Sequence, residues 1–118
     1  MTLPIINLKH RKDRLEQVLK ELESQRSKDY VLWEGVYDPE KPSVGIAKAH
    51  QQIILWASEQ NLPEVLIAED DIQFTGKGAL DYYLKSEPQD YDLYLGGISY
   101  GNDAQPSVWY PSMYSEIL

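Results

Sequence analysis

The chain has 118 residues, a formal net charge of −8 and no cysteine. This length suits one domain with one core. The absence of cysteine excludes disulfides and thiolate metal sites. The negative net charge disfavours nucleic acid and anionic membranes as partners. No apolar run approaches the roughly 20 residues of a membrane span, and the stretch from Leu3 to Leu8 is too short for a secretion signal. We therefore expect a cytoplasmic protein that does not span a membrane.

The first elements predicted along the chain are a strand, a helix and a second strand. Residues 4–8 are a short apolar run typical of a strand. Over residues 12–25, apolar side chains recur at the spacing of one helix face. Residues 30–33 form the next apolar run and predict the second strand.

A second helix and a third strand follow. The helix is expected from residue 44 or 45 to Glu59, with Ser43 as its N-cap. Its apolar face would contain Ile46, His50, Ile53, Ile54 and Ala57. The apolar run at residues 65–68 predicts a buried strand that leads directly into three carboxylates.

The remaining pattern predicts a short helix at residues 79–85, a strand at 92–95 and a weaker strand candidate at 108–110. Because strands alternate with helices, we expect an α/β fold of three layers with a mostly parallel sheet.

Positive charge is concentrated after the first strand. Four of the eleven lysine and arginine residues lie at positions 9, 11, 12 and 14. The N–H groups at a helix start attract anions, and guanidinium groups add charge-assisted hydrogen bonds. Arg11 and Arg14 can therefore address one anionic ligand. The alternative is a solvated basic turn, which is what most charge clusters form.

Two further motifs carry candidate chemistry. Gly45 and the alanines after it could let a ligand approach the helix backbone, although His50 taken alone is more often a core histidine. Glu69, Asp70 and Asp71 would repel one another unless a divalent cation lay between them, and carboxylates are preferred ligands of Mg²⁺ and Mn²⁺. The alternative for these acids is a polar turn after the strand.

Taken together, the motifs occur in a characteristic order. They are Asn-Leu-x-x-Arg-x-x-Arg at residues 7–14, Gly-x-x-x-x-His at 45–50, Leu-Ile-x-Glu-Asp-Asp at 66–71 with a phenylalanine at 74, and Tyr-Asp-Leu followed by Leu-Gly at 91–96. This arrangement resembles glycosyltransferase family 25, which includes lipopolysaccharide-biosynthesis galactosyl- and glucosyltransferases and collagen galactosyltransferases. The resemblance covers about residues 4–97.

The resemblance implies a GT-A-like fold of the nucleotide-diphospho-sugar transferases. It also implies an inverting transfer of a sugar, galactose or glucose, from a UDP donor to a cell-surface glycan such as lipopolysaccharide. The positions that match the family's donor-binding residues are Asn7, Arg11, Arg14, His50, Glu69 and Asp70. Asp71 matches the acidic residue expected to hold Mn²⁺ or Mg²⁺, and Asp92 and Asp103 are candidates for the catalytic base.

The sequence also departs from the family. Ile46 and Ala49 stand where members often carry cysteine and serine, and members typically continue well past the position of Leu118. We therefore expect one domain over residues 1–118 with a donor-binding half at about 4–97 and an incomplete C-terminal half. Either the chain is a truncated member, or it is a small member whose site is completed by a second copy or a partner.

Two alternatives remain open. The first is a catalytically inactive nucleotide-sugar-binding module, or a subunit or fragment of a larger transferase. The second is an α/β domain whose acidic turn binds nothing.

Overall fold

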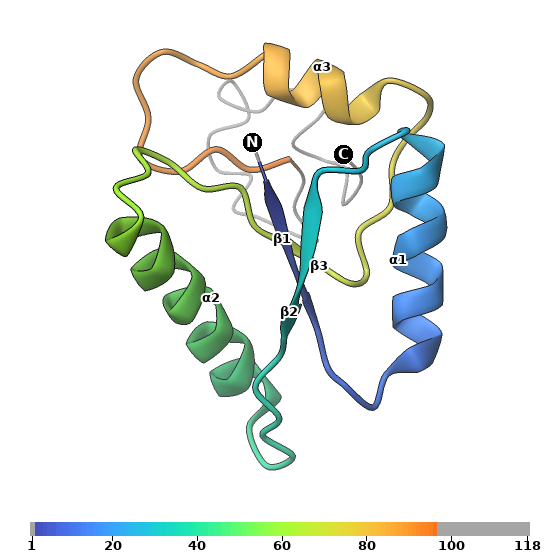
Figure 1. Cartoon of the computed structure of the whole chain (residues 1–118), viewed down its shortest axis with the longest axis vertical. Coiled ribbons are helices and arrows are strands. Elements are labelled where there is room, and N and C mark those ends of the chain that lie inside the picture. The colour runs from blue at the N-terminus through green and yellow to red at the C-terminus, as the bar shows by residue number, and fades with distance from the viewer. Residues whose placement is uncertain (1, 97–118) are drawn as a thin grey trace, which may run out of the picture.

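The alternating strand and helix patterns build a small α/β protein around a three-stranded parallel sheet (Figure 1). The computed structural model describes residues 2–96. In chain order its elements are β1 Leu3–Asn7, α1 Lys12–Ser24, β2 Tyr30–Glu34, α2 Pro42–Glu59, β3 Ala68–Glu69 and α3 Ala79–Lys85. Within these described residues, no helix is both long and apolar enough to cross a bilayer.

β1 is the centre of the sheet, whose strand order is β2-β1-β3. β1 pairs with β2 from Leu3 opposite Tyr30 to the end of both strands, and with β3 at Ile5 and Ile6. All five residues of β1 are buried. A parallel strand covered on both faces is apolar along its whole length, which explains the continuous Leu-Pro-Ile-Ile run.

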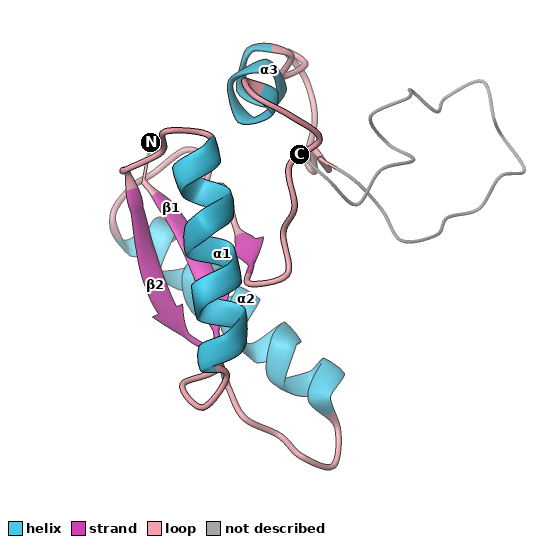
Figure 2. Ribbon diagram, turned by 90° about the vertical axis from the view of Figure 1, so that its right-hand side faces the viewer, coloured by secondary structure: helices cyan, strands magenta, loops and turns pink. Residues whose placement is uncertain are grey.

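The two long helices lie on opposite faces of the sheet, α1 on one side and α2 on the other (Figure 2). Each face has its own apolar cluster. The cluster under α1 contains Leu3, Ile5, Val18, Leu22, Ala68 and Ile72. The cluster under α2 contains Ile6, Ala49 and Ile53, with Trp33, Val65 and Ile67 against it. The expected α/β class with a parallel sheet is therefore confirmed.

The sheet is smaller than the sequence predicted. Only Ala68 and Glu69 of the third apolar run pair with β1, although the side chains of residues 65–67 still alternate between the two clusters. The predicted strand at residues 92–95 is wrong, because that segment has no regular structure. Tyr94 instead stacks on Tyr83 of α3 at a ring separation of 4.4 Å, and each hydroxyl donates to the other residue's carbonyl. The strand candidate at 108–110 lies outside the described residues.

α2 begins earlier than predicted. Its first residue is Pro42, whose fixed φ suits the first turn of a helix. Asp38 Oδ1 accepts a hydrogen bond from the Lys41 N–H at 2.9 Å and so closes the preceding loop. Ser43 therefore lies inside the helix, and its prediction as the N-cap is wrong.

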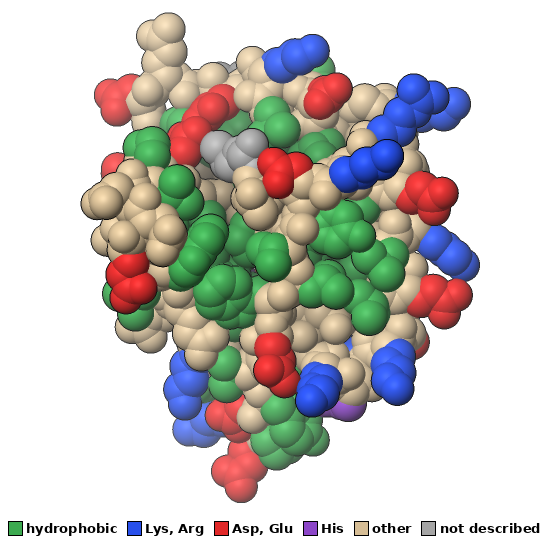
Figure 3. All heavy atoms as spheres, in the orientation of Figure 1, with side chains coloured by type: hydrophobic (Ala, Val, Ile, Leu, Met, Phe, Trp, Pro, Cys, Tyr) green, Lys and Arg blue, Asp and Glu red, His purple; other side chains and the backbone are tan. Residues whose placement is uncertain are grey.

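The buried stripe of α2 consists mainly of small residues. Its buried members are Gly45, Ala49, Ile53 and Ala57, four residues apart. Ile46 and Ile54, expected on the same face, are 43% and 55% exposed, and Figure 3 shows how much apolar side chain the surface carries. The stripe brings the helix backbone very close to the loop after β2. A Cβ on Gly45 would lie 2.3 Å from the Val36 carbonyl oxygen.

Replacing Gly45 by alanine should therefore destabilise the fold. The contact is with backbone and cannot be relieved by a rotamer change, and overpacking of this kind costs about 1–3 kcal/mol. The higher helix propensity of alanine returns roughly 1 kcal/mol. Because the clash is with backbone, we expect the cost near the upper end of that range and a net loss of up to about 2 kcal/mol in urea unfolding. Gly76→Ala is the control, since a Cβ there meets nothing within 4 Å. Equal stability of the two variants would contradict this packing.

Candidate functional site

The carboxyl ends of β1 and β3 meet where the direction of strand succession reverses. From β1 the chain crosses one face of the sheet through α1 to reach β2. From β2 it returns across the other face through α2 and adds β3 on the far side of β1. Open α/β sheets bind ligands just outside the strand ends at such a reversal. The residues immediately after β1 and β3 are therefore the natural place to look for a site.

Three polar side chains converge at this edge. Asn7, the last residue of β1, is 9% exposed and donates through Nδ2 to Asp70 Oδ2 at 2.9 Å. Arg14 of α1 places Nη1 at 3.5 Å from Asp70 Oδ1 and at 3.7 Å from Asp71 Oδ2. The Asp70 side chain is 14% exposed, whereas that of Asp71 is 64% exposed. The structure thus brings Asn7, Arg14, Asp70 and Asp71 together, as their shared assignment to one site requires.

Glu69 lies beside Asp70 in the chain but belongs to the other face of the sheet. It pairs in register with Ile6, which packs under α2. Its Oε2 lies 3.5 Å from Nε2 of His50, which α2 carries. Because successive residues of a strand point to opposite faces, Glu69 and Asp70 are directed to different helices. The end of β3 therefore carries one charge pair on each face of the sheet.

This division changes the interpretation of the acidic triplet. Within residues 2–96, no group of three or more histidine and carboxylate side chains is arranged to hold a metal ion. Asp70 is partnered by Asn7 and Arg14, and Glu69 by His50. Asp71, exposed and paired with Arg14 over the longest of these distances, is the carboxylate most accessible to a cation.

Arg11 makes its hydrogen bonds to Asp13, and it also lies close enough to Asp70 to feel the charge of that carboxylate. Its Nε and Nη2 each donate to a carboxylate oxygen of Asp13 at 3.0 Å. This double hydrogen bond, with a further one from the Arg14 backbone N–H, lowers the pKa of Asp13 to about 2. A carboxylate thus already lies at the start of α1, held by the arginine and the backbone N–H groups that would contact a bound phosphate.

The predicted base candidates are not part of this arrangement. Asp92 is exposed in the segment after α3 and, among the described residues, makes no hydrogen bond or ion pair. Asp103 lies outside the described residues. Sequence reasoning also missed the pairing of His50 with Glu69. The signal for it was present, because adjacent residues at a strand end must diverge to opposite faces.

Two surface hollows lie elsewhere on the described part of the chain. One, of about 1060 Å³, is lined by the C-terminal half of α1 and by residues that include Arg26 and Tyr30. Another, of about 370 Å³, lies at the end of α2 around Leu62 and Pro63. The second hollow includes Glu64, which accepts a hydrogen bond from the Tyr91 hydroxyl at 3.2 Å, but neither hollow is lined by an arginine paired with a carboxylate. The candidate site therefore rests on its chemistry and its place in the topology.

Comparisons with protein-family models, curated proteins and solved structures found no match to this chain. The resemblance drawn from the motifs accordingly stays a prediction.

The contact between Arg11 and Asp13 predicts a specific titration. Since the folded-state pKa of Asp13 is about 2 against an ordinary 3.8, the contact stabilises the fold above pH 3.8, and this contribution is lost as the pH falls through 2. In an NMR titration, Arg11→Gln should raise the pKa of Asp13 towards 3.8. Lys12→Gln also removes one positive charge but leaves the Arg11–Asp13 hydrogen bond in place, so it should raise the pKa of Asp13 far less. Equal shifts in both variants would show that net charge, and not the contact, lowers the pKa.

Proposed function

We propose that the carboxyl edge of the sheet binds the UDP part of a nucleotide sugar and that the chain is an inverting glycosyltransferase. The donor is UDP-galactose or UDP-glucose, and the acceptor is a cell-surface glycan such as lipopolysaccharide. The observation that carries the proposal is the placement of Arg14 between Asp70 and Asp71 at the strand-order reversal. A cytoplasmic location belongs to the proposal, because a cysteine-free chain suits a reducing compartment.

The start of α1 supports an anionic ligand. Arg11 and the backbone N–H of Arg14 already hold the Asp13 carboxylate there. A diphosphate brings more charge and more acceptor oxygens than a carboxylate, and arginine binds either in a bidentate geometry. The ligand would displace Asp13 from Arg11 and gain both the guanidinium and the helix N-terminus.

Asn7 and Asp70 support a polyhydroxyl ligand beside that anion. The Asn7 amide orients the Asp70 carboxylate by the hydrogen bond at 2.9 Å. A carboxylate fixed in this way is a rigid acceptor for the hydroxyl groups of a ribose or a sugar. In this proposal Asp70 contacts the ribose or the sugar of the donor, and Arg14 contacts the diphosphate.

The residues present also fit a divalent cation shared with the ligand. Mg²⁺ is usually held by one or two carboxylates together with substrate phosphates and waters, so the absence of a three-residue cluster from residues 2–96 is compatible with it. Asp71, with its exposed carboxylate, would hold Mn²⁺ or Mg²⁺. When bound, the cation neutralises charge on the departing diphosphate and orients the donor. Arg14 contributes positive charge to the same leaving group.

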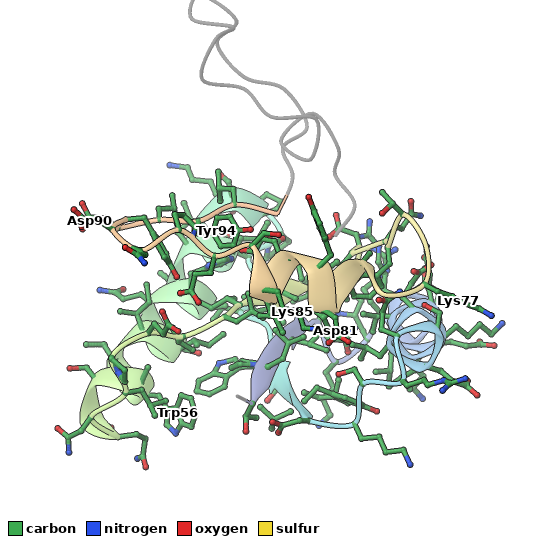
Figure 4. All side chains as sticks on the ribbon, turned by 90° about the horizontal axis from the view of Figure 1, so that it is seen from above. Trp56, Lys77, Asp81, Lys85, Asp90 and Tyr94 are labelled. Carbon is green, nitrogen blue, oxygen red and sulfur yellow. The ribbon has the colours of Figure 1, made fainter. Side chains whose placement is uncertain are left out.

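Isothermal titration calorimetry with UDP-galactose and UDP-glucose, with and without Mn²⁺, tests the proposal. We expect binding that Mn²⁺ strengthens. Asp71→Asn should weaken the Mn²⁺-dependent binding roughly tenfold or more, which is the loss typical of removing even an outer-shell metal partner. Asp90→Asn is the matched control, because Asp90 is an exposed aspartate on the loop after α3 (Figure 4).

The outcomes separate the candidate functions. No binding of either donor, with or without Mn²⁺, would overturn the proposal. Tight binding without sugar transfer or donor hydrolysis would favour the alternative of an inactive nucleotide-sugar-binding module. Identical affinities of the Asp71→Asn and Asp90→Asn variants would remove Asp71 from the site.

A further inference from the structure

We propose that His50, oriented by Glu69, is the base that accepts the proton of the attacking hydroxyl. This inference rests on the proposed function, because it assigns a role in the same reaction. His50 lies on α2 and Glu69 ends β3, with Nε2 and Oε2 at 3.5 Å. The resemblance to the glycosyltransferases predicted only a donor contact for His50 and placed the base elsewhere.

The pairing selects one nitrogen of the imidazole as the acceptor. A proton on Nε2 interacts favourably with the Glu69 carboxylate, and the neutral ring then carries its lone pair on Nδ1. No protein atom within residues 2–96 hydrogen-bonds to Nδ1. The side chain is 36% exposed, so a hydroxyl group can reach it. A carboxylate next to an imidazole also stabilises the imidazolium that forms when the ring accepts the proton.

The position of the pair suits an inverting displacement. In such a reaction the attacking oxygen and the departing diphosphate lie on opposite sides of the anomeric carbon. Arg14, Asp70 and Asp71, which would bind the donor, lie on the α1 side of the strand end. His50 lies on the α2 side, and the peptide bond between Glu69 and Asp70 joins the two groups. The residues that would bind the leaving group and the proposed base thus flank the same strand end.

The proposed step is balanced without any further reactant. The hydroxyl oxygen forms a bond to the anomeric carbon while the bond from that carbon to the β-phosphate oxygen breaks. The electron pair of the broken bond leaves with UDP, and the hydroxyl proton passes to Nδ1 of His50. Imidazole suits this role because it accepts and releases protons near neutral pH.

The test follows hydrolysis of UDP-galactose, in which water replaces the glycan as acceptor, by the release of UDP. His50→Gln should lower kcat about 100-fold or more, with KM and the calorimetric affinity for UDP-galactose unchanged within about twofold. Glu69→Gln should lower kcat by a smaller factor, because the imidazole loses only its orienting partner. His10→Gln is the control, since His10 packs edge-on against Tyr37 and should keep the activity of the unchanged protein.

A second measurement does not depend on replacing His50. The chain has two histidines, so His50 is the one left in the His10→Gln variant. Diethyl pyrocarbonate should inactivate hydrolysis by that variant, and bound UDP-galactose should slow the inactivation.

The outcomes of these experiments distinguish the role of His50 from the proposed function. Normal turnover in His50→Gln, or activity that persists after complete modification, would overturn the role of His50. Donor binding by the unchanged protein without hydrolysis would also overturn that role, while the donor site would stand. Neither binding nor hydrolysis would overturn the proposed function itself.

Discussion

The arrangement at the sheet edge depends on the hydrogen bond between Asn7 and Asp70. Asn7 is almost fully buried and the Asp70 side chain is part-buried. The Asn7 amide donates both to Asp70 and to the Arg11 carbonyl oxygen, so it links the end of β1 to the turn after β3 and to the start of α1. The bond therefore fixes the turn after β3 relative to the end of β1. With Asp70 directed towards α1, Glu69 must face α2 and Asp71 is left at the surface. This contact and the register of Glu69 opposite Ile6 together place the three acids.

Much of the fold could be predicted from the sequence because its signals are local. The heptad-like spacing in α1 and the apolar runs of β1 and β2 each identify an element without knowledge of its neighbours. The errors occur where tertiary contacts override the local pattern. Ile46 and Ile54 are exposed because Gly45 brings the α2 backbone against the carbonyl of Val36, which rotates the buried stripe onto the small residues.

Residues 92–95 show the same contrast between local pattern and tertiary contact. The apolar pattern of this segment suits a strand, yet Tyr94 stacks on Tyr83 of α3, and no sequence periodicity relates these two residues. At the site, the resemblance assigned Asn7, Arg14, Asp70 and Asp71 to one site, and the structure brings these four side chains together. The sequence could not show that Arg11 is held by Asp13, since that pairing depends on the geometry of one helix turn.

The division of charge between the two faces gives the proposed chemistry its physical basis. In the proposal, Arg14 and a cation held by Asp71 together offset the charge of the departing diphosphate beside α1. The imidazole next to a carboxylate beside α2 suits the positive charge that it gains with the proton. Three adjacent carboxylates that faced one cavity would repel each other as well as any phosphate. Their separation around the end of β3 leaves Asp71 for a cation and Glu69 for a histidine.

The central claim is that the carboxyl edge of the sheet, and not a surface hollow, is the ligand site. A titration of the ¹⁵N-labelled protein with UDP and Mg²⁺, followed by amide chemical shifts, tests it most directly. We expect the largest changes at the amides of Asn7, Arg11 and Arg14 and at residues 69–71. Changes concentrated instead around Arg26 and Tyr30, or around Leu62 and Pro63, or no changes at all, would contradict it.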